Sequence, residues 1–355
     1  MTPVEAGLRR RIASDGAVTV ARFMAEALGA YYRDRDPLGP DGDFVTAPEI
    51  SQMFGELIGL WAVAAWRQLG APARFRLVEL GPGRGTLMAD ALRAAGQAPG
   101  FLEAADIQLV EINARLRTAQ RDRLAGHDPT WQAAFDDVPG GPLVLIANEF
   151  LDALPVHQFV RRGGGWHERA VTVDGATDRL AWTDIPPDSR LDAAAADGID
   201  EEGIYEIGPA RTALVAAIAA RCVGDGGAAL FIDYGHDGAL VAGDSLQAVR
   251  GHAYHDPLTD PGSADLTAHV AFGALARAAA GMAARPWGPI SQQLFLDRLG
   301  LALRAEQLKA GASAAEAAAV EAARHRLIHR DEMGTLFRVL AVTAADAAAP
   351  AGFEE

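Results

Sequence analysis

A short run of apolar residues that ends in three spaced glycines has the residue types of a ligand-binding turn. Residues 75–80 read as a strand, Gly81-x-Gly83-x-Gly85 follows them, and a helical pattern comes next. A backbone without Cβ atoms can approach a ligand closely, so this order is typical of nucleoside-type binding. Dinucleotide sites repeat glycine as Gly-x-Gly-x-x-Gly, and Thr86 stands at that third position, which disfavours an NAD-dependent oxidoreductase.

Two carboxylates flank this turn in the sequence. Glu79 lies two residues before the first glycine, and Glu111 ends the next predicted strand. S-adenosylmethionine carries no phosphate, and its amino-acid end and sulfonium are cationic, which suits Glu79. A carboxylate at Glu111 can accept hydrogen bonds from both ribose hydroxyls. Although a glycine turn alone also fits a plain tight loop, the whole order predicts S-adenosylmethionine as the cofactor and S-adenosylhomocysteine as the product.

Polar residues also follow a second buried strand, residues 143–147, at the edge where ligands bind in open α/β sheets. Asn148 is expected at the cofactor. Glu149 could hold a cationic guanidinium and aim its nitrogen at the methyl group. Asp152 fits an assisting role and a helix cap equally well. His236, which follows the predicted strand 228–233, is a candidate base, a substrate contact or an ordinary surface histidine.

Other kinds of catalytic site find little support in the residues. Neither a Gly-x-Ser-x-Gly motif nor a Walker lysine is present. His252 and His255 lack further metal ligands nearby, so no metal site is predicted. The one cysteine, Cys222, excludes an internal disulfide and a multi-cysteine zinc site, and we expect it to be an inert buried thiol.

The net charge of −15 over 355 residues disfavours a nucleic-acid partner, which would need clustered Lys and Arg. An acidic surface would accept a basic protein segment, but it also simply keeps a protein soluble. The first 15 residues lack the apolar run of a secretory signal, and no segment approaches the roughly 20 apolar residues of a membrane span. We therefore expect a cytoplasmic protein without membrane insertion, whose oligomeric state stays open.

Short strands alternate with helices over much of the chain. Strands are predicted at residues 75–80, 107–112, 131–135, 143–147, 228–233 and 336–342, and helices at 18–28, 51–69, 86–95, before 124 and at 299–327. This alternation predicts an α/β fold with a mostly parallel sheet and helices on both faces. Residues 156–160 and 166–173 flank three glycines and predict an antiparallel hairpin in an inserted lobe.

These elements suggest five regions. They are an N-terminal helical region with a cofactor lid (1–72), the first part of the core (73–154), an inserted β-rich substrate lobe (155–206), the remainder of the core with a helical insertion (207–343) and a frayed tail (344–355). Turn-forming residues predict exposed loops at 31–44 and 186–200.

Several runs together resemble the MidA family of methyltransferases, which in eukaryotes is linked to assembly of mitochondrial respiratory complex I. They are residues 42–56, 78–87, 148–157, 233–236 and 262–270, and the similarity spans about residues 18–340. The resemblance implies a class I methyltransferase, Rossmann-like fold with added helical and β elements. It also implies symmetric dimethylation of an arginine on a complex I subunit or its bacterial counterpart.

The resemblance assigns further residues to the site. It implies that the turn and Glu111 bind the cofactor, that Asp137 lies near the adenine, and that a lid is formed by Thr46, Pro48, Glu49, Ser51 and Gln52. The same lid segment also fits a capped helix start with Glu49 in its first turn. The targeting segment of eukaryotic members is missing, which fits a bacterial cytoplasmic protein. A non-catalytic, cofactor-binding assembly factor is the alternative function.

Overall fold

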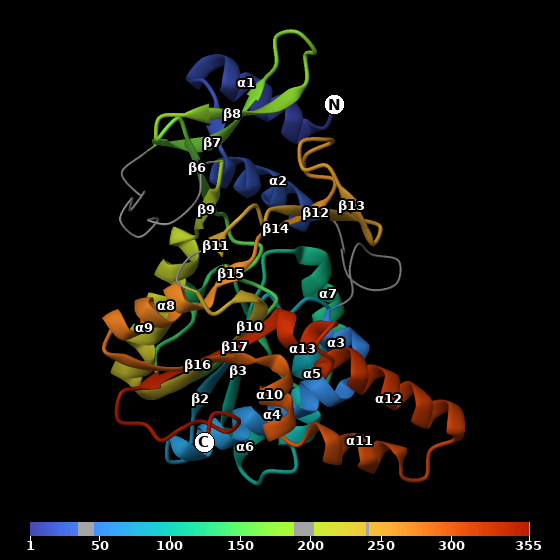
Figure 1. Ribbon diagram of the computed structural model, residues 1–355. Coiled ribbons are helices and arrows are strands. Elements are labelled where there is room, and N and C mark those ends of the chain that lie inside the picture. The colour runs from blue at the N-terminus through green and yellow to red at the C-terminus, as the bar shows by residue number, and fades with distance from the viewer. Residues whose placement is uncertain (35–45, 188–201, 239–240, 355) are drawn as a thin grey trace.

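The computed structural model describes residues 1–34, 46–187, 202–238 and 241–354. Figure 1 shows a lower lobe built on a large sheet with helices around it, and an upper lobe of smaller sheets and the N-terminal helices. Residues 31–34 of the loop expected at 31–44 are helical, and its other residues, like most of the loop expected at 186–200, lie outside the described residues. Among the described residues, no helix combines the length and the hydropathy that crossing a bilayer requires.

The large sheet confirms the predicted mostly parallel arrangement. Its order is β16 (Ala284–Ser291), β17 (Phe337–Ala344), β10 (Gly227–His236), β5 (Leu143–Asn148), β2 (Phe75–Leu80), β3 (Ala105–Val110) and β4 (Thr130–Gln132), with β15 (Val270–Ala271) beside the end of β10. The strands from β10 to β4 are parallel, whereas β17 runs antiparallel to both of its neighbours. All six residues of β5 are buried, as expected for a strand covered on both faces.

Helices cover both faces of this sheet, also as predicted. One face packs against α4 (Gln52–Gln68), α5 (Thr86–Ala95) and α10 (Gln292–Arg298), and the other against α8 (Pro209–Arg221) and α9 (Phe272–Gly281). The remaining helices of this lobe are α3 (Ala47–Ile50), α6 (Phe101–Ala104), α7 (Ala114–Arg123), α11 (Leu301–Lys309), α12 (Ala314–Ile328) and α13 (Met333–Leu336). Helices α11 and α12 form the helical insertion and project to one side (Figure 1).

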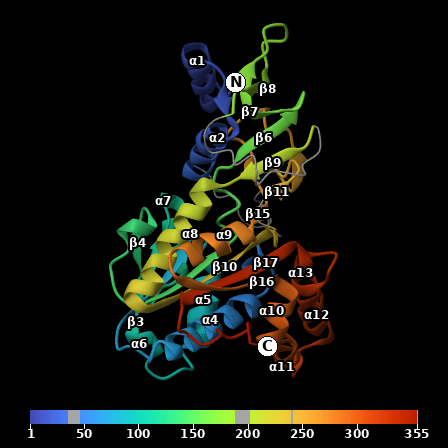
Figure 2. The same cartoon turned by 60° about the vertical axis from the view of Figure 1, so that its left-hand side comes forward.

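The upper lobe is antiparallel and contains the predicted hairpin. One sheet has the order β1 (Val18–Thr19), β7 (Gly165–Val173), β6 (His157–Arg162), β9 (Ile204–Ile207) and β11 (Val241–Ala242), with β8 (Leu180–Ile185) on β7. A second sheet contains β13 (Ala253–His255), β12 (Gln247–Arg250) and β14 (Asp265–Thr267). Helices α1 (Pro3–Asp15) and α2 (Val20–Asp34) lie against these strands (Figure 2). Residues 1–34 and 241–267 therefore share a lobe with residues 157–187 and 202–207, a grouping that the five predicted regions did not contain.

Two local expectations need correction. The strand expected at 131–135 ends at Gln132, and a short 3-10 turn over Phe135–Asp137 follows it. The tail, described as far as residue 354, is packed around Phe353 rather than frayed, because Phe353 is buried and its ring lies 5.5 Å from that of Phe295. Burial of an aromatic side chain supplies the contacts that hold the tail in place.

The order of the strands determines where a ligand can bind. From β2 the chain proceeds to β3 and β4 on one side, and then returns to β5 on the other side of β2. Open parallel sheets bind ligands beyond the carboxyl ends of the strands at this kind of reversal. Helix α2 of the upper lobe covers this edge from above (Figure 1).

Candidate functional site

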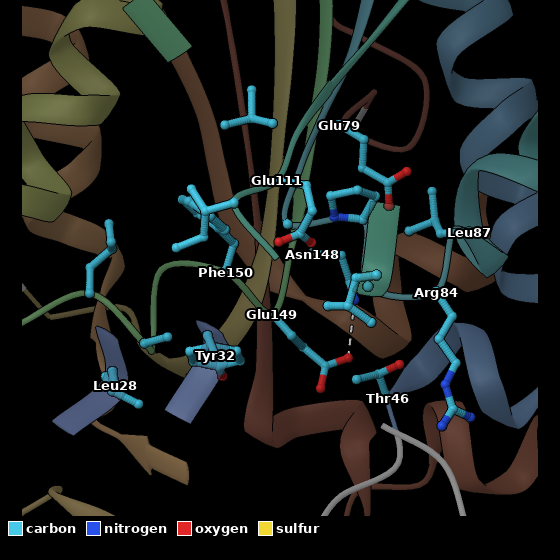
Figure 3. A pocket seen from close by; sticks show the side chains of 18 of the residues that line it. Leu28, Tyr32, Thr46, Glu79, Arg84, Leu87, Glu111, Asn148, Glu149 and Phe150 are labelled. Carbon is cyan, nitrogen blue, oxygen red and sulfur yellow. Dashed lines mark hydrogen bonds between the residues drawn. The ribbon is translucent and has the colours of Figure 1, made fainter. Parts of the chain in front are cut away.

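A cavity of about 410 Å³ lies at the carboxyl ends of β2, β3 and β5, within the range of roughly 300–1,000 Å³ that is usual for small-molecule sites. Its walls contain nine of the residues predicted from the sequence: Thr46, Pro48, Glu49, Glu79, Gly81, Gly83, Glu111, Asn148 and Glu149. Figure 3 labels five of them, Thr46, Glu79, Glu111, Asn148 and Glu149, around the cavity. The fold therefore brings most of the predicted site together.

The glycine turn lines the cavity with its backbone. Gly81 has φ +61°, and a Cβ atom there would lie 2.7 Å from a ring carbon of Phe150. Gly85 also has a positive φ, but it is the N-cap of α5 and does not line the cavity. The lack of a side chain at position 81 therefore leaves room for the Phe150 ring and lets a ligand approach the turn.

Gly81→Ala is expected to weaken binding of S-adenosylhomocysteine about tenfold, because the new methyl group displaces Phe150 into the cavity. Gly70→Ala is the matched control, since Gly70 also has a positive φ but open space around it. Both variants should lose on the order of 1 kcal/mol of stability, and calorimetric titration should show an affinity loss in Gly81→Ala alone. Equal affinities in the two variants would contradict this role of Gly81.

Glu79 presents a buried acceptor to the cavity. Its side chain is 3% exposed, and its Oε2 atom has no hydrogen-bond partner among the described residues. Burial, and then the charge of Glu111, raise the pKa of Glu79 to about 8. The Oδ1 atom of Asn148 is likewise buried without a partner in the described part of the chain. Buried acceptors of this kind require donors, so the site fits a ligand with a cationic amino group.

Glu111 is oriented by neighbours on the same side of the cavity. Its Oε1 accepts the backbone N–H of Asn113 at 2.7 Å, and its Oε2 accepts Nε2 of Gln120 at 3.3 Å. Burial raises the pKa of Glu111, and the hydrogen bond from Asn113 opposes that shift. The carboxylate is thereby held at the end of β3, where ribose hydroxyl groups could donate to it.

Glu149 connects the end of β5 to the α3 segment. Its φ is +50°, which is uncommon for a residue other than glycine, and its N–H donates to the carbonyl of Ile232 at 2.9 Å. Its Oε1 accepts the N–H of Ala47 at 3.1 Å and Nδ2 of Asn148 at 3.0 Å, the latter drawn in Figure 3. Burial above all raises the pKa of Glu149 to about 7. The site thus contains a carboxylate that changes charge near neutral pH.

Only part of the predicted lid faces the cavity. Thr46, Pro48 and Glu49 line it, and Glu49 Oε1 accepts the hydroxyl group of Thr86 at 2.5 Å. Ser51 caps α4 by accepting the N–H of Met53, and Gln52 donates to Glu56, so neither side chain lines the cavity. Ser51 is therefore a helix cap, but of α4, whereas Glu49 lies in the first turn of the preceding helix α3.

Asp152 lies behind the cavity wall and braces the loop that follows β5. Its Oδ2 accepts the Tyr234 hydroxyl at 2.5 Å, and its backbone N–H donates to Asp233 at 3.1 Å. The buried guanidinium of Arg211 donates to the carbonyls of Asp152 and Leu154. Asp152 therefore shapes the wall without lining the cavity.

Two further candidates lie outside the cavity lining. Asp137 accepts the N–H of Ala134 within its own 3-10 turn. His236 accepts the N–H of Gly238, and burial lowers its pKa. Within the residues that the structure describes, no group of three His, Cys, Asp or Glu side chains could hold a metal ion.

Sequence reasoning missed the contribution of α2 to the cavity. Leu28 and Tyr32 line it, although they belong to the upper lobe. The Tyr32 hydroxyl donates to Asp265 at 2.9 Å, and its carbonyl accepts Nδ2 of Asn113 at 2.6 Å. These partners lie 233 and 81 residues away along the chain, so no local pattern could have identified them.

Comparison with known proteins gives consistent matches. Residues 57–290 match the family model described as S-adenosyl-L-methionine-dependent methyltransferase. The mouse protein named "Protein arginine methyltransferase NDUFAF7, mitochondrial" is 39% identical over 89% of this chain and 79% of its own length. The fruit fly protein named "Protein arginine methyltransferase NDUFAF7 homolog, mitochondrial" is 36% identical over 94% of this chain and 83% of its own length.

A solved structure agrees over nearly the entire chain. A Burkholderia thailandensis protein, described as a methyl transferase and bound to S-adenosyl-homocysteine, superposes with a TM-score of 0.85 and 31% identity. The match covers 99% of this chain and 94% of that protein.

The expected cytoplasmic location needs correction. The mouse, zebrafish and human relatives are all mitochondrial proteins by name.

Proposed function

We propose that this chain, which belongs to the S-adenosyl-L-methionine-dependent methyltransferase family, methylates an arginine side chain of a protein. The methyltransferase class and its S-adenosyl-L-methionine cofactor follow from the family and from the related structure. Arginine as the acceptor is supported by the names of relatives that are 35–39% identical. In this chain, arginine as the acceptor rests on one observation. The Glu149 carboxylate lines the cavity, and burial raises its pKa to about 7.

The cofactor supplies an electrophilic methyl group when it is bound. Glu111 accepts hydrogen bonds from the ribose hydroxyls, and Glu79 pairs with the cationic amino group. The turn at Gly81 and Gly83 lets the backbone approach the cofactor closely. Phe150 closes the cavity beside the turn.

Glu149 orients the acceptor. A guanidinium stays charged at neutral pH, so charge pairing and alignment contribute more than a strong base would. The carboxylate pairs with the guanidinium and directs one nitrogen at the methyl group, and a new N–C bond forms as the S–C bond breaks. The nitrogen then loses a proton. Glu149 lines the cavity and has a pKa of about 7, so it is the group that accepts this proton. Asp152 contributes through the loop that it braces, and His236, which does not line the cavity, has no direct role in this proposal.

The partner that we propose is a protein subunit of respiratory complex I or its bacterial counterpart, with symmetric dimethylarginine as the product. The test uses purified protein, S-adenosylmethionine with a trideuterated methyl group and the recombinant subunit, followed by peptide mass spectrometry. We expect label on one arginine and none when that arginine is replaced by lysine. Label on another residue type would contradict arginine as the acceptor. Cofactor binding without any labelled product would favour the non-catalytic assembly factor.

A further inference from the structure

Gln120 is a fully buried side chain on α7, a helix with few other buried residues. Its Nε2 donates to the carbonyl of Gly83 at 2.6 Å and to Oε2 of Glu111 at 3.3 Å. Its Oε1 accepts the indole N–H of Trp131 at 2.7 Å. One amide therefore contacts the glycine turn, the carboxylate at the end of β3 and the strand β4.

The neighbours of Gln120 determine which way its amide points. An indole N–H can only donate a hydrogen bond, so the oxygen of Gln120 must face Trp131. The NH₂ group then faces the carbonyl of Gly83 and the carboxylate of Glu111, and both of these groups accept. All three contacts are satisfied in this orientation, whereas a flipped amide would satisfy none of them.

The glycine turn also lies close to Gln120. A Cβ atom added at Gly85 would lie 3.4 Å from Cα and Cγ of Gln120, so even the smallest side chain there would be in van der Waals contact with α7. The same side chain thus supports both cofactor-binding elements from behind, without lining the cavity itself.

We infer that Gln120 is a positioning residue that holds the glycine turn and Glu111 in the arrangement that recognises the ribose hydroxyls of the cofactor. The inference rests on the proposed function, because it takes Glu111 as the ribose ligand. Loss of the amide would remove the donor to Oε2 of Glu111, leaving the Asn113 N–H on Oε1, and would leave the carbonyl of Gly83 without its Gln120 donor. Recognition of the ribose should therefore suffer more than binding of the rest of the cofactor.

The test compares S-adenosylhomocysteine with its 2′-deoxyribose analogue by calorimetric titration. Wild type should bind S-adenosylhomocysteine about tenfold more tightly, which is the scale of one hydrogen bond to a charged group. Gln120→Met, which keeps the volume and removes the amide, should bind S-adenosylhomocysteine about tenfold more weakly and the analogue nearly unchanged. The ratio of the two affinities should then approach one.

Gln108→Met is the matched control, because Gln108 is a buried glutamine on β3 whose amide contacts Asp106 and Gln132 instead. It should keep the wild-type ratio. Kinetics provide an independent readout, since Gln120→Met should raise KM for S-adenosylmethionine about tenfold and change kcat less than about twofold.

Trp131→Phe is the second variant and covers the case in which Gln120→Met does not fold. It removes the donor that orients the amide, and it should lower the affinity ratio about threefold. A wild-type ratio in Gln120→Met or in Trp131→Phe would overturn the inference and leave the proposed function intact. An equal fall of the affinity ratio in Gln108→Met would also overturn the inference, because the effect would then come from a general loosening of the sheet edge and not from the contacts of Gln120. A wild-type protein that binds neither ligand would overturn the proposed function as well.

Discussion

Glu79→Gln is expected to weaken binding of S-adenosylhomocysteine on the order of 10–100-fold at pH 8, the scale of a charge-assisted hydrogen bond. Burial and the charge of Glu111 raise the pKa of Glu79 to about 8 in the ligand-free site. A cationic amino group favours the ionised carboxylate, so binding below pH 8 must release a proton from Glu79. Wild-type affinity should therefore rise from pH 6 to pH 8, by up to about tenfold per pH unit, and then level off.

Calorimetric titration over this pH range, in buffers of different ionisation enthalpy, measures both the affinity and the proton release. In Glu79→Gln the release and most of the pH dependence should disappear. Unchanged pH dependence would show that Glu79 does not meet the ligand.

The stability of the ligand-free protein separates loss of a ligand contact from damage to the fold. A raised pKa stabilises the fold below the unfolded-state pKa of about 4.5, and this contribution is lost as pH rises through about 8. Glu79→Gln has no buried charge to form, so it should be more stable than wild type at pH 8. If Glu79→Gln were less stable than wild type at pH 8, its weaker binding would be explained by misfolding.

Glu149→Gln is expected to lower kcat at least about a hundredfold, the scale of an essential orienting or proton-accepting group. The amide oxygen can still accept the N–H of Ala47, so the α3 segment should stay in place. Affinity for S-adenosylhomocysteine should therefore change little. The charge that pairs with the acceptor guanidinium is lost, and so is the acceptor for its proton.

The pH dependence of catalysis tests this role separately. The ionised form of Glu149 pairs with a cation, and the pKa of Glu149 is about 7, so kcat/KM for the protein substrate, measured at saturating S-adenosylmethionine, should rise as pH rises through about 7. The profile of Glu149→Gln should lack this rise. Glu49→Gln is the matched control, because Glu49 lines the same cavity but bonds to Thr86. An equal loss in both variants, or full activity in Glu149→Gln, would contradict the assignment.

Much of the central sheet could be predicted because its signals are local. The strand at residues 75–80 and the helix at residues 86–95 begin and end where the pattern places them. A buried parallel strand is a continuous apolar run, and glycine marks its end. Once the strands are parallel, their carboxyl ends share one edge, so Glu79, Glu111 and Glu149 were expected together.

The rest of the site depends on contacts between distant segments. Tyr32 reaches the cavity because its hydroxyl bonds to Asp265, and neither residue has a local signal for this contact. Gln120 is buried in a helix rich in charged residues, where periodicity does not identify an inward face. Asp152 lies in the loop after β5 and His236 is the last residue of β10, and neither lines the cavity. Chain geometry after a strand end is decided by packing, which the local sequence does not encode.

A crystal structure of the complex with S-adenosylhomocysteine would test the central claim most directly, namely that the cavity binds the cofactor with Glu149 on the acceptor side. We predict ribose hydroxyls on the Glu111 carboxylate, the amino group within hydrogen-bond distance of Glu79, and the sulfur atom facing Glu149. S-adenosylhomocysteine bound elsewhere, or in this cavity with the sulfur atom turned away from Glu149, would contradict the claim.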